Sequence, residues 1–287
     1  MKVTVLEPSG FCAGVDRAIN LAIKTKNENP QNKVVILGML VHNQDALKSL
    51  EKQGISTIFK ENSSLEELAK LVKAPSIVIL TAHGHDKKIE KILKENGNEI
   101  VDATCPFVQN SFKEIQNEIN EGSNVFYIGV KNHPEANAAL SLSDKIYFID
   151  SKNPVIPEHL CGKHVVISQT TLAKDEVSEI INNVKTIYPE TKVIEGICNA
   201  STERQRAIKT VPNDVDGIIV VGGANSNNSK TLFSIAKDLY PNKKVLLIEN
   251  ASQIKEKDLI GLNHIAISSG ASTPRETIEQ IKSKLLN

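Results

Sequence analysis

The sequence predicts an α/β fold of three pseudo-symmetric units with mostly parallel sheets. Two observations lead to this prediction. Short apolar runs rich in β-branched residues alternate with longer amphipathic runs along all 287 residues, which is typical of parallel strands joined by helical crossovers. Three cysteines are also equally spaced, because Cys105 lies as far from Cys12 as Cys198 lies from Cys105. Equal spacing indicates an internal repeat.

Strands are expected where the apolar runs are short and bounded by turn residues. The predicted strands are 3–6, 33–37, 55–59, 76–80, 99–102, 124–128, 145–149, 164–167, 191–194, 217–221, 244–248 and 264–267. Helical periodicity predicts helices over 16–26, 45–53, 64–73 and 87–96, and further helices that begin at Pro106, Pro134, Lys174, Thr202, Lys230 and Pro274. Gly97 marks a helix end, and Pro106 suits a first helical position, where its missing N–H is not needed.

Three domains follow from this pattern: residues 1–103 with Cys12, 104–196 with Cys105, and 197–287 with Cys198. The strand before each cysteine is taken as the first of four strands in its third of the chain. Each cysteine then lies where a strand ends and a helix begins. The sequence shows no low-complexity linker, so we expect the units to pack closely.

The charge balance excludes several classes of partner. Lysine plus arginine equals aspartate plus glutamate at 34 each, so no basic field favours nucleic acid or an anionic membrane. No apolar run reaches membrane-spanning length and Met1 leads into a strand rather than a signal peptide, so we expect a cytoplasmic protein. Four scattered cysteines do not suit a secreted disulfide scaffold. With no long apolar stripe in the sequence, we expect a monomer.

Polar clusters recur after the second and fourth strands of each unit. They are residues 41–43, 132–135, 225–229, 81–85, 168–171 and 268–272. Open parallel sheets bind ligands at the carboxyl ends of their strands, so three units arranged with threefold pseudo-symmetry would direct these loops and the cysteines into one cavity. A single histidine or serine at a strand end is more often a turn residue. Recurrence in three copies favours a site.

Glu135 is the one carboxylate in these six loops. It has two interpretations. After Pro134 it suits the first turn of a helix, where a negative charge favours the helix dipole. In a closed cavity it could instead relay protons, supported by His133.

The three spaced cysteines suit a soft metal centre. They lack the close C-x-x-C pairs of zinc fingers, and thiolates select zinc or iron–sulfur centres. Zinc would require a fourth ligand, whereas three cysteines on a [4Fe–4S] cluster leave a fourth iron open to substrate. Such a cluster is a Lewis acid and an electron donor together. The alternative is that each cysteine is a small buried apolar residue, which is our interpretation of Cys161, because it lies outside the repeat.

Several motifs resemble those of the LytB family of 4-hydroxy-3-methylbut-2-enyl diphosphate reductases. The resemblance runs in order from about residue 3 to the C-terminal helix. The matching motifs are Gly10-Phe11-Cys12-Ala13-Gly14-Val15 with Arg17-Ala18, Val41-His42-Asn43, Ala82-His83-Gly84, Asp102-Ala103-Thr104-Cys105-Pro106, His133-Pro134-Glu135, Ser168-Gln169-Thr170-Thr171-Leu172, Asn225-Ser226 with Asn228-Ser229, and Gly270-Ala271-Ser272.

The resemblance implies a trefoil around a central [4Fe–4S] cluster held by Cys12, Cys105 and Cys198. It implies that the fourth iron takes the allylic hydroxyl of the substrate, that Thr170 bonds this hydroxyl, and that Glu135, with His133, relays protons. The residues that match the diphosphate contacts are His42, His83, His133, Ser226, Asn228 and Ser272. The implied reaction is the last step of the methylerythritol phosphate route, which gives isopentenyl and dimethylallyl diphosphates.

The sequence differs from the family's usual pattern at one residue of these motifs. The loop commonly written Ser-Ser-Asn reads Ser226-Asn227-Asn228 here. Asn227 still offers a donor, so we expect it to bind the diphosphate, by a contact that differs from that of serine. No flavin or nicotinamide motif is visible, so electrons are expected from a reduced ferredoxin or flavodoxin.

Two other functions compete with this one. A quinolinate-synthase-like dehydratase resembles the same plan of three α/β units around a three-cysteine cluster, but its substrates carry carboxylates. A cluster-based oxygen or iron sensor would use the labile fourth iron as its signal. The balanced charge and the absence of a nucleic-acid motif weigh against the sensor.

Overall fold

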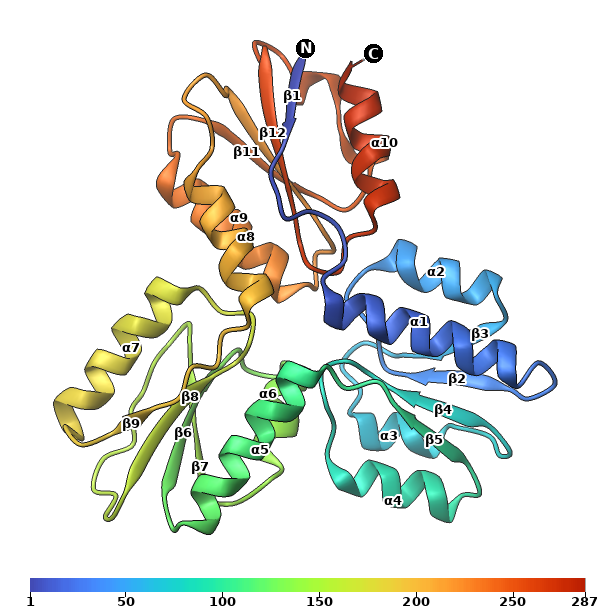
Figure 1. Cartoon of the computed structure of the whole chain (residues 1–287), viewed down its shortest axis with the longest axis vertical. Coiled ribbons are helices and arrows are strands. Elements are labelled where there is room, and N and C mark those ends of the chain that lie inside the picture. The colour runs from blue at the N-terminus through green and yellow to red at the C-terminus, as the bar shows by residue number, and fades with distance from the viewer. Residues whose placement is uncertain (287) are drawn as a thin grey trace. The chain divides into compact units, whose positions relative to one another are not determined.

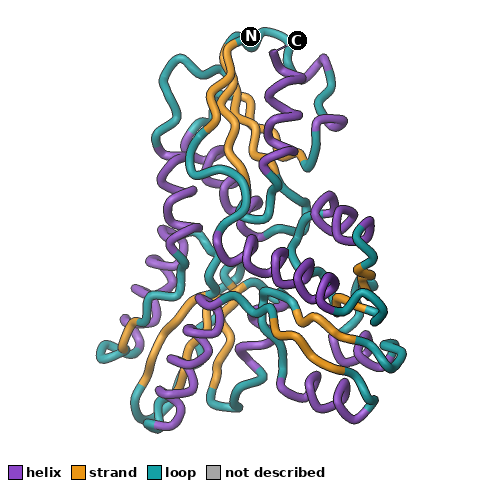
Figure 2. Tube along the Cα trace, turned by 45° about the vertical axis from the view of Figure 1, so that its right-hand side comes forward, coloured by secondary structure: helices purple, strands orange, loops and turns teal. Residues whose placement is uncertain are grey.

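The computed structural model describes residues 1–286. It contains three four-stranded sheets in which every neighbouring pair of strands is parallel. Strands and helices alternate along the chain, as Figure 2 shows in orange and purple. The predicted α/β class is therefore confirmed.

The first sheet has the order β3-β2-β4-β5. Its strands are β2 (Val34–Leu37), β3 (Ile55–Ile58), β4 (Ile77–Leu80) and β5 (Glu99–Asp102). The helices of this segment are α1 (Ala13–Glu28), α2 (Gln44–Lys52), α3 (Leu65–Lys70) and α4 (Lys87–Glu95). Ser64 caps α3 with a reciprocal capping box to Glu67, which fixes the start of that helix. One apolar cluster joins α3 and α4 to β2 and β4.

The second sheet has the order β7-β6-β8-β9. Its strands are β6 (Asn124–Gly129), β7 (Ile146–Asp150), β8 (His164–Ser168) and β9 (Lys192–Val193). Its helices are α5 (Pro106–Asn120), α6 (Pro134–Leu140) and α7 (Lys174–Ile187). Alternate residues of a strand face opposite sides of the sheet. Val125 and Tyr127 therefore pack with α5 and α6, whereas Phe126 and Ile128 pack with α7.

The third sheet has the order β1-β12-β10-β11. Its strands are β1 (Lys2–Val5), β10 (Gly217–Val221), β11 (Lys244–Ile248) and β12 (His264–Ser269). Its helices are α8 (Asn199–Lys209), α9 (Asn227–Leu239) and α10 (Arg275–Leu286), with short 3₁₀ turns η1 (Ala251–Gln253) and η2 (Glu256–Asp258). β1 and β12 come from opposite ends of the sequence and lie side by side (Figure 1).

The three sheets share one strand order, and this corrects the expected grouping of strands. The strand before each cysteine does not open the sheet of its own third: β5 pairs with β4, β9 with β8, and β1 with β12. The physical reason is the crossover, because α4 and α7 each return the chain to the free edge of the preceding sheet. After α10 no further strand follows in residues 1–286, and β1 occupies the corresponding edge.

The described chain consists of two compact units, each defined by its own internal contacts. Unit 1 comprises residues 1–15, 42–46 and 198–286 and holds the third sheet, and unit 2 comprises 16–41 and 47–197 and holds the other two sheets. The division into three domains at residues 103 and 196 stays a prediction.

The central strands are buried on both faces of their sheets, which explains why their sequences are continuous apolar runs. All residues of β2, β4 and β10 are buried, as expected for parallel sheets that carry helices on their faces.

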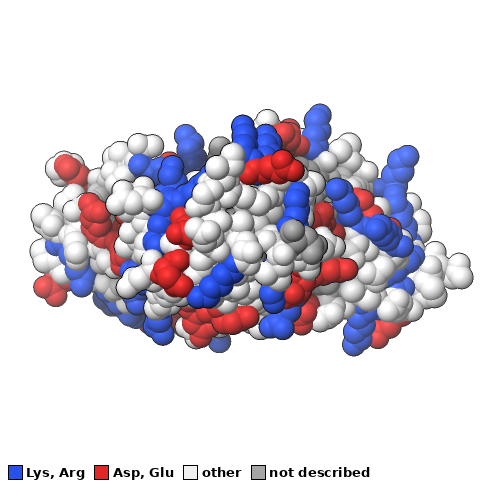
Figure 3. All heavy atoms as spheres, turned by 90° about the horizontal axis from the view of Figure 1, so that it is seen from above, with Lys and Arg blue, Asp and Glu red and all other residues white. Residues whose placement is uncertain are grey.

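Charged side chains of both signs are interspersed over the face of the molecule that Figure 3 shows, in keeping with the balanced composition. None of the helices in residues 1–286 combines the length and apolar character needed to cross a membrane.

Candidate functional site

Each of the three spaced cysteines lies between a strand and a helix. Cys12 follows β1 and precedes α1, while Cys105 is the N-cap of α5 and Cys198 the N-cap of α8. All three are partly buried and none forms a disulfide. Each therefore lies where backbone N–H groups of a helix N-terminus favour a negatively charged group.

In unit 1, the loop that carries Cys12 is held against the loop after β12. The backbone N–H of Gly10 donates to Ser269 Oγ at 3.0 Å, and the N–H of Cys12 donates to Ala271 O at 3.0 Å. Gly10 has φ +80°, a conformation that glycine adopts without strain. A Cβ there would also lie 2.6 Å from Cγ of Arg275. Glycine is therefore required at this turn.

A chain of hydrogen bonds joins Cys198 to Cys12 within unit 1. The thiol of Cys198 donates to Ser201 Oγ at 3.3 Å, and Asn228 Nδ2 donates to the same oxygen at 3.1 Å. Asn228 Oδ1 accepts the N–H of Ala271 at 3.0 Å, and the carbonyl of Ala271 accepts from Cys12. The structure thus links two predicted metal ligands through a predicted substrate-binding residue.

His42 lies beside two other loops of unit 1. Ser272 Oγ donates to His42 O at 3.4 Å. Gly223 packs so closely that a Cβ there would lie 2.6 Å from the same carbonyl. Burial lowers the pKa of His42 to about 4, and the charge of Lys230 acts in the same direction. The imidazole is therefore neutral near pH 7.

Ser226 fixes the start of α9 and thereby the positions of its neighbours. Its Oγ accepts hydrogen bonds from Ser229 N at 3.3 Å and from Ser229 Oγ at 3.0 Å. The helix consequently begins at Asn227, one turn earlier than the predicted start at Lys230. Asn227 is partly buried and Asn228 buried, both in the first turn. A Ser-capped N-terminus of this kind suits an anion.

In unit 2, Glu135 and Thr170 form a buried acid–hydroxyl pair. Thr170 Oγ1 donates to Glu135 Oε2 at 2.8 Å, and the backbone N–H of Thr170 donates to Oε1 at 2.8 Å. Tyr127 Oη donates to Oε1 at 3.4 Å. Glu135 is 2% exposed. Burial raises its pKa to about 7 although these three hydrogen bonds act in the opposite direction.

His133 and His83 lie together on the same side of unit 2. His133 is the N-cap of α6, and its Nδ1 accepts the N–H of Glu135 at 3.2 Å. A neutral His133 ring therefore carries its proton on Nε2. The rings of His83 and His133 meet edge to face, with centroids 5.7 Å apart.

Cys105 is hydrogen-bonded to the loop that carries His83. Its N–H donates to Ala82 O at 3.0 Å. The next glycine, Gly84, has φ +82°, and a Cβ there would lie 2.5 Å from Cε2 of Phe112 on α5. The loop after β4 and the start of α5 are therefore packed against each other without room for a side chain at Gly84.

The predicted site residues form two sets, one in each unit. Unit 1 contains Cys12, His42, Cys198, Ser226, Asn227, Asn228 and Ser272, and unit 2 contains His83, Cys105, His133, Glu135 and Thr170. Within residues 1–286, no group of three or more His, Cys, Asp or Glu side chains is arranged to hold a metal ion. Ligation of a cluster by the three cysteines therefore stays a prediction.

Cys161 and one surface pocket lie apart from these sets. Cys161 is exposed rather than buried, so its expected role as an apolar core residue is wrong.

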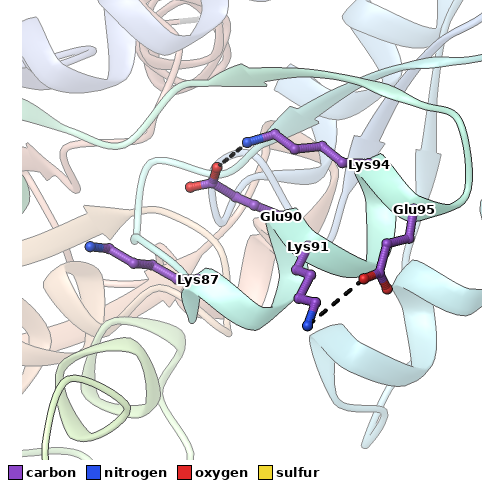
Figure 4. A pocket seen from close by; sticks show the side chains of 5 residues that line it. All are labelled: Lys87, Glu90, Lys91, Lys94 and Glu95. Atoms are coloured by element: carbon purple, nitrogen blue, oxygen red, sulfur yellow. Dashed lines mark hydrogen bonds and ion pairs between the residues drawn. The ribbon is translucent and has the colours of Figure 1, made fainter.

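The surface pocket lies on α4 and is lined by Lys87, Glu90, Lys91, Lys94 and Glu95 (Figure 4). Four of these side chains form two ion pairs, Lys94 with Glu90 at 2.9 Å and Lys91 with Glu95 at 3.8 Å. None of the predicted site residues lines this pocket.

Three residues of the site were missed by sequence reasoning. Ser201 bridges Cys198 and Asn228, Tyr127 contacts Glu135, and Arg204 donates to the Gly10 carbonyl. Two of them carried a sequence signal. Ser201 stands three residues after Cys198 and directly before the predicted helix start at Thr202. Tyr127 lies two residues after Val125 in a predicted strand, so the two side chains are expected on the same face of the sheet. Nothing local marks Arg204.

Parallel sheets with thiols, neutral donors and one buried acid near the carboxyl ends of their strands are typical of α/β enzymes that act on small molecules. Comparison with known proteins agrees. The family model described as LytB protein matches residues 3–286, and the chain belongs to this family.

Relatives and solved structures extend the match over whole chains. A 4-hydroxy-3-methylbut-2-enyl diphosphate reductase of Malacoplasma penetrans is 36% identical over 281 residues, which is 96% of this chain and 93% of the relative. A Caldanaerobacter subterraneus protein of the same name is 34% identical over 290 residues, covering 99% and 96%. The structure of the E-1-hydroxy-2-methyl-but-2-enyl-4-diphosphate reductase from Plasmodium falciparum gives a TM-score of 0.88 at 28% identity, covering 100% of this chain and 88% of that chain.

A second solved structure also matches the chain. It is that of an (E)-4-hydroxy-3-methyl-but-2-enyl diphosphate reductase described as the terminal enzyme of the non-mevalonate pathway. It gives a TM-score of 0.67 at 32% identity, covering 100% of this chain and 99% of that chain.

Proposed function

We propose that the two sets of site residues together perform the reductive dehydroxylation of an allylic diphosphate. The activity itself follows from the family: the chain is a 4-hydroxy-3-methylbut-2-enyl diphosphate reductase, an oxidoreductase that performs the terminal step of the non-mevalonate pathway. The proposed products are isopentenyl and dimethylallyl diphosphates.

The family generally carries an iron–sulfur cluster, and the three spaced cysteines suit one. None is in a disulfide, all are partly buried, and each lies at a helix N-terminus. Thiolates are the ligands that iron–sulfur clusters use. We assign Cys12, Cys105 and Cys198 to a [4Fe–4S] cluster. When bound, this group would supply electrons and an open iron site for the allylic hydroxyl.

Neutral donors are proposed to bind the diphosphate. The capped N-terminus of α9 contributes Ser226, Asn227 and Asn228, and the neighbouring loops contribute His42 and Ser272. His83 and His133 contribute from unit 2. Helix N-termini and polar side chains can bind phosphate groups without a basic patch, which fits a chain with equal numbers of acidic and basic residues.

The Glu135 and Thr170 pair is proposed to hold the proton. Because the one hydrogen of the Thr170 hydroxyl is donated to Glu135, its lone pairs remain available to accept from the substrate hydroxyl. A carboxyl with a pKa of about 7 is protonated in a large fraction of molecules at neutral pH, and such a group can donate a proton. His133 fixes the backbone at Glu135 through its Nδ1. When Glu135 is protonated, the hydrogen bond between Thr170 and Glu135 reverses, so that the carboxyl O–H donates to Thr170 Oγ1 and the Thr170 hydroxyl donates its own hydrogen to the departing oxygen.

The observation that most supports this assignment is the buried contact between Thr170 and Glu135. A buried carboxyl with a raised pKa, bonded to a hydroxyl, is the environment expected of a catalytic acid. It favours the proton-relay interpretation of Glu135 over that of a helix-dipole residue. Electrons would come from a reduced ferredoxin or flavodoxin. A cytoplasmic monomer stays our prediction for the state of the protein.

The first experiment is a Mössbauer measurement on anaerobically prepared protein, with iron and sulfide analysis, before and after addition of 4-hydroxy-3-methylbut-2-enyl diphosphate. We expect a four-iron cluster with one distinct iron whose signal shifts on addition of the substrate. Turnover with a strong chemical reductant should follow. Zinc, or no metal in a folded anaerobic sample, would contradict the assignment of the cysteines. Turnover of quinolinate precursors, or specific binding to DNA without turnover, would favour the dehydratase or the sensor instead.

A further inference from the structure

Arg204 is a buried arginine on α8, the helix that has Cys198 as its N-cap. Only 2% of its surface is exposed, whereas Arg206 on the same helix is exposed. Arginine is rarely buried without a charged partner, because removing the guanidinium from water is costly. The position of Arg204 therefore needs a physical reason.

The guanidinium of Arg204 donates hydrogen bonds to the backbone of two separate segments. Its Nη1 donates to Ala200 O at 3.1 Å, within the first turn of α8, and its Nη2 donates to Gly10 O at 2.7 Å. Gly10 belongs to the same loop as Cys12. A single side chain thus connects the helix of Cys198 with the loop of Cys12, all within unit 1.

Both hydrogen bonds go to neutral carbonyls, which leaves the positive charge without a bonded anion. Its Nε is buried and has no hydrogen-bond partner. Among residues 1–286, no carboxylate forms an ion pair with Arg204. Burial lowers its pKa. Negative charges nearby oppose this, in decreasing order those that Cys12 and Cys198 carry as thiolates and then those of Glu203 and Glu7.

We propose that Arg204 is a positioning residue that supplies the positive counter-charge for the metal-bound thiolates of Cys12 and Cys198. The charge also raises the reduction potential of the group they hold. This inference rests on the proposed ligation of an iron–sulfur cluster by these cysteines.

The direction of the effect follows from the balance of charge. Reduction of the bound group by one electron from an external reductant, without a proton, would add one negative charge to the group that Cys12 and Cys198 would hold. A fixed positive charge in a partly buried environment stabilises the added electron. Groups around an iron–sulfur site are known to set its potential in this way. Removing the charge must therefore make reduction harder.

Three variants separate charge from packing. Arg204→Gln removes the charge and keeps an amide donor, and Arg204→Lys keeps the charge and loses the planar fork. Arg206→Gln is the matched control, because it changes the net charge by the same amount on an exposed side of the same helix. Each protein is reconstituted anaerobically and analysed for iron and sulfide. The midpoint potential is then measured by a redox titration followed by EPR and visible absorption.

For Arg204→Gln we expect reduction to be about tenfold less favourable, which is about 59 mV more negative for a one-electron couple. Arg204→Lys should shift the potential much less, and Arg206→Gln should match the parent protein. Loss of iron from Arg204→Gln, with retention in Arg204→Lys, would also support the counter-charge. An unchanged potential in Arg204→Gln at equal iron content would overturn the proposal. An equal shift or equal iron loss in both Arg204 variants would overturn it too, because packing alone would then explain the effect.

The same samples separate the two proposals. If the parent protein takes up no iron–sulfur cluster, the proposed function of the cysteines fails before Arg204 is tested. If the parent protein holds the cluster and the Arg204 variants behave as the control does, only the role of Arg204 fails.

Discussion

Thr170 donates to the carboxylate of Glu135 through both its hydroxyl and its backbone N–H, each at 2.8 Å. Both residues are buried, and Tyr127 reaches the same carboxylate from β6. These hydrogen bonds hold the carboxyl in one orientation, while burial raises its pKa. This relationship leads to the first two predictions.

Glu135→Gln should retain the cluster and substrate binding but lose turnover. General acid–base groups contribute about 10²- to 10⁴-fold to rate, so we expect kcat to fall at least about 10²-fold. The measurement is anaerobic turnover with a chemical reductant, alongside iron content and the Mössbauer shift with substrate. Thr170→Ser, which keeps the hydroxyl, is the control and should retain most activity, whereas Thr170→Val should not. Near-normal turnover of Glu135→Gln would return Glu135 to the role of a first-turn residue of α6.

The raised pKa of Glu135 should also appear in stability. Its pKa is about 7 in the folded protein against an ordinary value of 4.5, so the folded state binds the proton more tightly. The stability that the group contributes is complete below about pH 4.5 and is lost as pH rises through about 7. Glu135→Gln lacks this loss. Its stability relative to the parent protein should therefore increase by about 3 kcal/mol between about pH 4.5 and pH 8.

Thermal unfolding of both proteins at several pH values measures this difference. Glu179→Gln, which removes an exposed carboxylate on α7, is the control and should show no such trend. A difference between Glu135→Gln and the parent protein that does not change with pH would mean that Glu135 titrates normally.

Pyrophosphate binding should be coupled to protonation of His42. The pKa of His42 is lowered to about 4 by burial and by Lys230, so the free protein holds it neutral. An adjacent diphosphate would stabilise the imidazolium and raise this pKa, and binding would then take up a proton. The affinity for inorganic pyrophosphate should therefore increase more steeply as pH falls in the parent protein than in His42→Gln. Calorimetry in buffers of different ionisation enthalpy measures the proton uptake, and equal uptake by both proteins would remove His42 from the diphosphate site.

Cys105→Ser should lose most of the cluster and all activity, because a hydroxyl is a poor replacement for a soft thiolate. Cys161→Ser is the matched control, since Cys161 is exposed and lies outside the repeat. It should keep full iron content. Iron and sulfide analysis of both variants decides the assignment. Iron loss from Cys161→Ser with retention in Cys105→Ser would mean that the wrong three cysteines were chosen.

Asn227→Ser introduces the serine that the family commonly has at this position. Asn227 lies in the first turn of α9, after the Ser226 cap, and both side chains can donate a hydrogen bond there. We expect KM to change by less than about fivefold, since about 1 kcal/mol separates one modest hydrogen bond from another. Steady-state kinetics measures it. A tenfold or larger change would show that the asparagine makes a contact of its own.

Much of the fold could be predicted from the sequence, and the sequence also named candidate site residues. Periodicity and turn residues are local signals, so the strands were placed to within one or two residues, and the start of α5 at Pro106 is confirmed. Motif spacing marked the loop residues for the same reason. The predicted helix starts at Thr202 and Lys230 lie three residues after the starts of α8 at Asn199 and α9 at Asn227. For α9 the reason is the cap by Ser226, which depends on side-chain geometry.

Only the tertiary structure decided which strands share a sheet and which side chains meet. β1 pairs with β12 across almost the whole chain, and no local pattern records such a pairing. Arg204 contacts Gly10 from far along the sequence. Tyr127 on β6 and Thr170 in the loop after β8 meet at Glu135. These contacts depend on how each sheet is assembled, because hydrogen bonds and burial act through space. The chemistry of each residue is fixed by the sequence, whereas its pKa and its partners are set by the packing around it.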